Sequence, residues 1–266
     1  MTPIERTLSH VSTLDELARR PTSVGSLDAR AKVVVLFGFL VTLASYSRHD
    51  IVRPLPLLVF LAVGMALGDV PWRVVVARLA IASPFAIFVG IWNPLFETRP
   101  LLHVGPLVVS AGWVSCLSVV ERFAFGVTCV LLLVATTGLD AVAAALGRLG
   151  MPRVFVTQLL LLYRYGFLLG AEASRMLRAH ALRVPTHPRP TLRTMRSLLG
   201  ELLVRSLTRA EHVHVAMLCR GFDGEMRRKS PLHFGLRDTV FVVGSGSFFL
   251  LVRVLDLPRW LGSIVS

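Results

Sequence analysis

The chain has 266 residues, 54 % of them hydrophobic, and a mean hydropathy of +0.66, which is too apolar for an ordinary soluble domain. Its 29 basic and 16 acidic residues give a net charge of +13. Long runs without charge have no use on a DNA-binding surface, so the composition argues against a nucleic-acid partner. The excess of positive charge instead fits the cytosolic segments of a bacterial inner-membrane protein.

Apolar runs in the first half of the chain predict four membrane spans, and residues 1–137 are therefore expected to form an N-terminal membrane part. The runs are Val33–Ser47, Pro54–Gly68, Leu79–Phe96 and Ala111–Thr137. The first has 15 residues, fewer than the about 20 that a span needs. We expect Lys32 to snorkel and extend it. Turn-forming residues around His103 indicate an external loop before the fourth run.

Glu121 and Arg122 are two adjacent ionisable residues inside the fourth run. Such residues are costly in a membrane and are often functional. Being adjacent, they point to different faces of a helix and do not simply pair with each other. Two interpretations stay open: contacts with neighbouring helices of the bundle, or a position near the membrane edge.

The character of the chain changes after Gly138. Leu139–Gly150 has the pattern of a short amphipathic helix, which Pro152 ends. Val154–Gly170 is apolar except for Arg164, and its 17 residues could cross a membrane. Because it leads directly into a basic segment, we expect it to lie at or just inside the cytosolic face, in a helix that ends at Arg183.

A proline-rich linker, residues 184–190, precedes a second long amphipathic pattern over Leu192–Cys219. From Glu172 to Arg237 there are 13 basic and 5 acidic residues, a surplus of eight, so this segment is expected to be cytosolic. We therefore predict cytosolic or interfacial helices over residues 138–237. Residues 238–266 are expected to hold the last membrane helix, in the apolar run Thr239–Val252.

Each of these two long helices is expected to end with an arginine, Arg183 and Arg220, where the helix dipole favours a cation. Gly221 is typical of the residue that terminates a helix. Two such guanidinium groups suggest that a partner protein pushes this chain at two points. The alternative is that both belong to a solvated basic face near anionic lipid.

Catalytic motifs are not found. Neither of the two lysines, Lys32 and Lys229, follows the glycine that a phosphate-binding loop requires, so ATP is not expected to bind in that way. His212 and His214 diverge by about 200° on a helix, so they cannot bind one ion together. We predict no catalytic, cofactor-binding or metal-binding residue in this chain.

Two segments of the chain resemble the transmembrane coupling (T) component of energy-coupling-factor importers, in particular the CbiQ family. The first segment runs from Thr137 to Arg183 and carries Leu146, Leu149, Pro152, Tyr163-Arg164-Tyr165 and Ala179. The second carries Ala216, Met217, Arg220, Gly221 and Phe222, and Leu27–Lys32 is similar to the entry of the family's first span. Val184 stands where the family has glycine, and Cys219 where it has alanine.

The resemblance implies an all-α, L-shaped polytopic membrane protein, with about five transmembrane helices and a cytosolic helical coupling domain. It implies two CbiO-like ATPase subunits, which bind ATP and Mg²⁺, and a CbiM-like substrate-binding S component with a CbiN-like accessory protein. Arg183 and Arg220 would dock the ATPase subunits. The residues that would support the coupling helices are Ala179, Ala216, Met217, Gly221, Phe222, Pro152 and Arg164.

On this interpretation the chain is a non-catalytic, multi-pass subunit of the bacterial inner membrane, in contact with lipid. Cobalt is the first expectation for the cargo, with nickel or a vitamin as alternatives. A stand-alone ion-coupled transporter is disfavoured because Glu121 is essentially the only acid within a span and no inverted halves are visible. A lipid-modifying enzyme is disfavoured because no acidic or histidine cluster faces the membrane.

Overall fold

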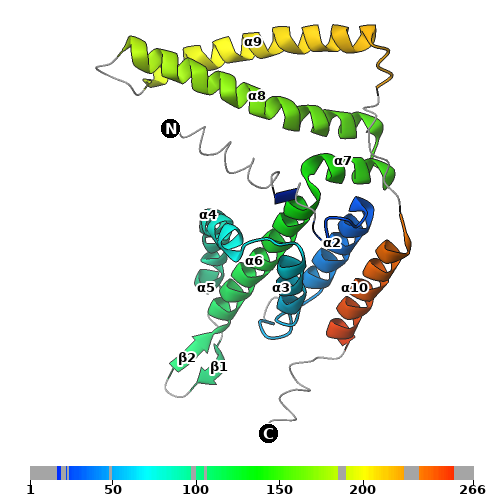
Figure 1. Ribbon diagram of the computed structural model, residues 1–266. Coiled ribbons are helices and arrows are strands. Elements are labelled where there is room, and N and C mark those ends of the chain that lie inside the picture. Colours follow the sequence, from blue (N-terminus) through cyan, green and yellow to red (C-terminus); the bar gives the residue numbers. More distant parts are fainter. Residues whose placement is uncertain are drawn as a thin grey trace. The chain divides into compact units, whose positions relative to one another are not determined.

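The computed structural model describes residues 17–18, 22, 24–47, 50–96, 100–104, 107–184, 190–224 and 234–254. The predicted helical fold is confirmed over this part of the chain, with one short β-hairpin in addition (Figure 1). The elements are α2 (Ala29–Ala44), α3 (Leu57–Leu67), α4 (Trp72–Gly90), α5 (Trp92–Phe96), β1 (Pro100–Val104), β2 (Leu107–Ser110), α6 (Ala111–Thr137), α7 (Leu139–Arg148), α8 (Arg153–Arg183), α9 (Leu192–Cys219) and α10 (Leu236–Val254).

The chain forms two compact units, and one boundary between them falls between Gly138 and Leu139. The bundle unit contains α2–α6, the hairpin and α10, whereas the α7–α9 unit contains the three helices between α6 and α10. Gly138 has φ +77°, a left-handed conformation that glycine adopts without steric cost. The chain can therefore turn sharply where it leaves α6.

In the bundle unit, α2 and α10 run parallel to each other and α6 runs antiparallel to both (Figure 1). The start of α2 is bonded to the start of α10, where the Asp28 N–H donates to Asp238 Oδ1 at 2.7 Å. Their far ends meet where Arg253 donates to the carbonyl oxygen of Ser45 at 3.2 Å. Bonds that link segments so far apart in sequence fix the register of the two helices.

The core of the bundle unit is an aromatic cluster from three helices. Phe39 of α2 is fully buried and lies 5.8 Å, between ring centroids, from both Phe60 of α3 and Phe249 of α10. Between α4 and α6 the helices approach closely through Gly90, where an added Cβ would lie 3.0 Å from the Cys116 sulfur. Small residues at such contacts allow the dispersion-driven packing on which membrane helices depend.

Helix α4 starts earlier than the predicted span and is not broken by Pro84. The prediction counted only the charge-free run, but Arg73 and Arg78 are accommodated near the start of the helix. Pro84 has no N–H to donate to the carbonyl of Ala80, four residues earlier. The Ser83 hydroxyl donates to that carbonyl instead, at 3.0 Å. Because a side-chain hydroxyl replaces the missing backbone N–H as the donor, the helix can continue through Pro84.

Three of the described helical segments are long and apolar enough to cross a membrane: Trp72–Pro94, Gly112–Thr137 and Arg153–Arg183. Helices α2 and α3, of 16 and 11 residues, are shorter than the about 20 residues of a full span. The expected number of five spans stays a prediction. So does the placement of 154–170 at the cytosolic face, because α8 meets the length and composition of a span.

Three local expectations need comment. Lys32 does not snorkel but is buried, with its ammonium donating to the carbonyl oxygen of Thr136 at 3.1 Å. The segment expected to be an external loop forms the antiparallel hairpin of β1 and β2, although Gly105 and Pro106 lie outside the described residues. Arg122 contacts a neighbouring segment, donating to the carbonyl of Ser47. Both carboxylate oxygens of Glu121 are buried without a hydrogen-bond partner in the described part of the chain.

Candidate functional site

Helices α8 and α9 form an antiparallel pair, and the two predicted docking arginines lie at its opposite ends (Figure 1). The turn after α9 returns to the start of α8, where the Thr157 hydroxyl donates to the carbonyl oxygen of Gly224 at 3.0 Å. Arg220 therefore lies near Thr157, whereas Arg183 ends α8. At about 1.5 Å of rise per residue, Thr157 and Arg183 are about 39 Å apart along α8.

The end of α9 is a Schellman turn, as the Arg-Gly-Phe sequence predicts. The Phe222 N–H donates to the Met217 carbonyl at 3.0 Å, and the Gly221 N–H donates to the Leu218 carbonyl at 2.9 Å. Gly221 has φ +77°, the left-handed conformation that this turn requires. Arg220 occupies the cap position and is exposed. The guanidinium is thus presented at the negative end of the helix dipole.

The end of α8 closes in a different way. Helix α8 ends at Arg183, as predicted, and Val184 follows with φ −127° and ψ 73°. Its N–H donates to the carbonyl oxygen of His180 at 3.0 Å, which completes the last helical turn without a left-handed residue. Arg183 is exposed. Valine in the place of the family's glycine therefore changes the turn but keeps the arginine at the helix terminus.

The residues expected to support the coupling helices are spread over the α7–α9 unit. Pro152 is the N-cap of α8, and Arg164 and Ala179 are exposed along that helix. Ala216 is exposed on α9. Met217 and Phe222 line one side of an open groove of about 390 Å³ between the two helices, and Leu161, Leu162, Tyr165 and Leu207 line it as well. The structure thus brings only Met217 and Phe222 together.

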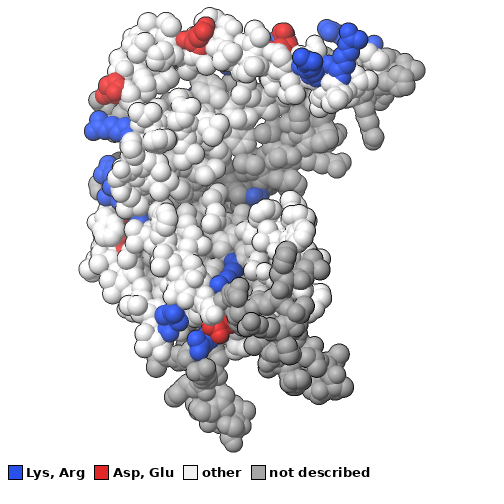
Figure 2. All heavy atoms as spheres, turned by 180° about the vertical axis from the view of Figure 1, so that it is seen from behind, with Lys and Arg blue, Asp and Glu red and all other residues white. Residues whose placement is uncertain are grey.

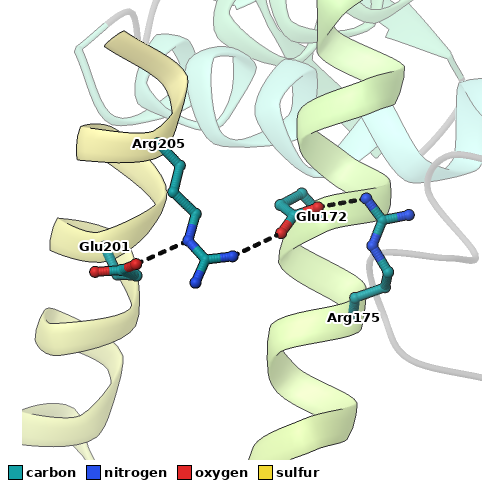
Figure 3. A network of polar contacts seen from close by, with 4 residues as sticks. All are labelled: Glu172, Arg175, Glu201 and Arg205. Atoms are coloured by element: carbon teal, nitrogen blue, oxygen red, sulfur yellow. Dashed lines mark hydrogen bonds and ion pairs between the residues drawn. The ribbon is translucent and has the colours of Figure 1, made fainter. Parts of the chain in front are cut away.

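A polar network joins α8 to α9 away from both tips (Figure 3). The Arg205 guanidinium of α9 donates from Nε to Glu201 at 2.7 Å and from Nη1 to Glu172 of α8 at 3.2 Å. The other carboxylate oxygen of Glu172 accepts from Arg175. The hydrogen bond and charge of Glu201 raise the pKa of Arg205, so this guanidinium remains protonated. The network fixes the two helices at one point along their length.

Sequence reasoning did not find this network. The spacings Glu172–Arg175 and Glu201–Arg205, three and four residues, are those of intrahelical pairs and are visible in the sequence. The bond between Arg205 and Glu172 depends on how α8 and α9 pack, which periodicity does not specify. The available signal was the presence of two acids within a strongly basic segment.

Much of the surface of α8 and α9 is apolar. None of the residues of α9, which is described throughout, is buried. Among the leucines that recur at helical spacing in the amphipathic pattern of α9, Leu198 and Leu202 are half-buried, whereas Leu199, Leu203 and Leu207 are exposed. On the face that Figure 2 shows, basic and acidic side chains are separated by uncharged surface. Exposed leucines in this number on one helix suit a contact with protein or membrane.

No group of three potential metal ligands among His, Cys, Asp and Glu occurs in the described ranges. The exposed side chains of the α7–α9 unit include guanidinium groups and aliphatic groups. Such groups suit macromolecular contacts: arginine forks onto carboxylates and carbonyls, and the aliphatic surface is covered by a partner or by lipid.

A known protein family matches most of the chain. The family described as "CbiQ: Cobalt transport protein" matches residues 21–231 of the chain. The chain belongs to the CbiQ family. The match extends from the residues before α2 to beyond the end of α9, so it covers α2–α6 of the bundle unit and all three helices of the α7–α9 unit, and it ends before α10.

Similar proteins share modest sequence identity with this chain. An uncharacterized protein of Methanocaldococcus jannaschii is 25 % identical over 246 residues, 87 % of this chain and 82 % of that protein. A second uncharacterized protein of the same organism is 30 % identical over 107 residues, 40 % of each chain. The cobalt transport protein CbiQ of Rhodobacter capsulatus is 32 % identical over 111 residues, 39 % of this chain and 46 % of that protein.

Membership of the CbiQ family, together with the long apolar helices, makes this chain a membrane component of cobalt transport. The roles of Arg183, Arg220 and the supporting residues in docking stay predictions.

Proposed function

We propose that this chain is the transmembrane coupling subunit of an ATP-driven importer in the bacterial inner membrane. Two ATPase subunits, which bind ATP and Mg²⁺, grip Arg183 and Arg220. Their closure moves α8 and α9, and these helices pass the movement to a substrate-binding membrane protein. The cargo is the cobalt ion, and this chain performs no catalysis.

The observation that carries this proposal is the placement of the two exposed arginines at opposite ends of one antiparallel helix pair. About 39 Å of helix lies between the two ends, which is too far for a single groove to hold both guanidinium groups. Two separate sockets, one in each ATPase subunit, fit this spacing. A change in the distance between the sockets then acts directly on the axes of α8 and α9.

The chemistry of each contact follows from the helix termini. A guanidinium at the end of a helix can donate to carboxylates and carbonyls of a groove in a planar fork. The exposed apolar surface of α8 and α9 offers a contact for the substrate-binding protein, which would bury Leu199, Leu203 and Leu207. Polar contacts would thus hold the ATPase subunits, and apolar contacts would pass their movement on to the substrate-binding protein.

The test is to replace Arg183, Arg220 or both by alanine in the full complex and to measure co-purification of the ATPase subunits and cobalt uptake. We expect each single change to weaken docking or to separate hydrolysis from uptake, and the double change to abolish uptake. Arg209→Ala, at an exposed position in α9 about 25 Å along the helix from Leu192 and about 16 Å from Arg220, is the matched control and should have no effect.

Full assembly and uptake in the double variant would refute the docking role. Transport by the isolated chain, without any ATPase, would instead favour a stand-alone ion-coupled transporter. Competition of cobalt uptake by nickel or by a vitamin distinguishes the possible cargoes, because the cargo is held by the partner and not by this chain.

A further inference from the structure

A buried cluster of charged groups joins the ends of three helices in the bundle unit. Asp28 caps the start of α2, Lys32 lies in its first turns, and Asp238 lies in the first turn of α10. Thr136 lies in the last turn of α6. The exposed fractions of these four residues are 5, 5, 5 and 6 %, so the cluster is withdrawn from solvent.

Each carboxylate of the cluster binds the backbone at the start of a helix. Asp238 accepts the N–H groups of Asp28 at 2.7 Å and of Gly235 at 2.8 Å, one on each oxygen. Asp28 accepts the N–H of Arg30 at 2.8 Å. Asp238 therefore caps its own helix and also holds the N-cap residue of the neighbouring one, which pins α10 to α2.

Lys32 extends this connection to the third helix. Its ammonium donates to the carbonyl oxygen of Thr136 at 3.1 Å, and the charges of Asp238 and Asp28 both attract it. The last carbonyls of α6 carry the negative end of the helix dipole, which also favours a cation. A buried ammonium without such partners would be strongly destabilising. The bond to Thr136 is thus a requirement of burying the lysine there.

The place of this bond in the chain gives it a role in coupling. Thr136 lies two residues before Gly138, the residue with positive φ at which the chain leaves the bundle unit for α7. The chain joins the α7–α9 unit to the bundle unit at Gly138 and again between Pro231 and Leu232, before α10. A force that travels along the covalent chain through Gly138 reaches the bundle unit at the last turn of α6. A free last turn would unwind under that force, whereas a turn bonded to α2 and, through Asp238, to α10 moves as one body with them.

We propose that Lys32, with Asp28 and Asp238, is a positioning residue for coupling: it clamps the last turn of α6 so that movement of the α7–α9 unit is passed to the bundle unit. This role rests on the proposed function. The clamp itself, however, is a property of the isolated chain and can be measured without a partner.

The clamp is tested by hydrogen exchange on the purified chain in detergent. Lys32→Met removes the ammonium that donates to the Thr136 carbonyl and keeps the length of the side chain. Because this leaves the negative charge of Asp238 without its cation, Lys32→Met is combined with Asp238→Asn. The asparagine is neutral and keeps an oxygen that can accept the Asp28 N–H. We compare the double variant with Asp238→Asn alone. The amides of the last turn of α6 should exchange about tenfold faster, the effect of losing one hydrogen bond to a charged group.

The role in coupling is tested in the full complex, with uptake per ATP hydrolysed as the readout. We expect the Lys32 variants to keep the ATPase subunits, because Arg183 and Arg220 are unchanged, but to transport less cobalt per ATP. Arg253→Met is the control: it removes the bonds to the Ser45 hydroxyl at 3.1 Å and to the Ser45 carbonyl at 3.2 Å, together with the contact with the Tyr46 ring. These contacts lie at the other ends of α2 and α10, so this variant breaks at least as many bonds between these two helices without touching the last turn of α6. Its uptake per ATP should equal that of the wild type.

Unchanged exchange at the end of α6, or unchanged uptake per ATP, would overturn the proposal. Loss of uptake with a normal ratio of uptake to hydrolysis would indicate a purely structural role and would also overturn it. A wild-type chain that binds no ATPase subunit would defeat the proposed function and the coupling role with it, while the exchange measurement would still decide whether Lys32 clamps α6.

Discussion

Gly68, at the end of α3, offers a direct test of how tightly the last turn of α6 is packed. An alanine Cβ at this position would lie 2.7 Å from Thr136 Cγ2 and 2.9 Å from the Gly64 carbonyl oxygen. Carbon atoms in contact are normally about 3.5–4.0 Å apart. Thr136 cannot easily rotate its methyl group away, because its hydroxyl donates to the Leu132 carbonyl at 2.8 Å. The substitution Gly68→Ala must therefore displace α3 from α6.

Overpacking of this kind costs about 1–3 kcal/mol. Removing a glycine from the unfolded chain returns about 0.4–1 kcal/mol, so the expected net loss of stability is roughly 1–2 kcal/mol. This corresponds to a factor of about 5–30 in the ratio of folded to unfolded protein. The measurement is the free energy of reversible unfolding of the detergent-solubilised chain, monitored by tryptophan fluorescence.

Gly200→Ala is the matched control, because an added Cβ within α9 meets no atom within 4 Å. It should leave the chain as stable or more stable, by about 0.5–1 kcal/mol. Thr136→Ser removes the obstructing methyl group and keeps the hydroxyl, so it should partly restore the stability of Gly68→Ala. Equal stability of the Gly68 and Gly200 variants would refute the close contact between α3 and α6.

Two further predictions concern the helix pair and the aromatic core. Arg205→Gln removes the bond to Glu172, so the distances measured between spin labels on α8 and α9 should become longer and more broadly distributed. Glu201→Gln breaks only an intrahelical pair and should leave these distances unchanged. Identical distance distributions in the two variants would contradict a role of the network in spacing the helices. Phe249 is 4 % exposed, so Phe249→Ala should lower the free energy of unfolding by about 3–5 kcal/mol in the same assay. Leu250 is 68 % exposed, and Leu250→Ala should lower it much less. Similar losses of stability in the two variants would argue against the aromatic cluster as the core.

The helices of the α7–α9 unit were predictable because local signals define them. Leu192–Cys219 was predicted with the bounds that the structure has, since apolar periodicity runs up to an Arg-Gly-Phe terminus. Arg183 was likewise correct as the end of α8. Periodicity and cap residues act within a few residues of each other, so a single sequence contains what is needed to place these helix ends.

Features that depend on distant contacts were missed. The sequence around Lys32 suggested a snorkelling side chain, and only the packing of α6 and α10 against α2 turns it into a buried donor. The start of α4 was placed too late because a charge-free run was taken as the helix, whereas Arg78 is tolerated within it. The bond between Glu172 and Arg205 depends on helix packing in the same way.

Helices α8 and α9 end in different ways, and this difference bears on how many copies of this chain bind one ATPase dimer. Arg183 is followed by Val184 with φ −127° and ψ 73°, and Arg220 is followed by Gly221 with positive φ, so the surroundings of Arg183 and Arg220 differ. In the proposed assembly, a dimer of identical ATPase subunits would present two equal binding sites to these two unequal helix ends. A single copy of this chain would occupy both sockets, leaving none for a second copy, and the two halves of the motor would become inequivalent as soon as it binds.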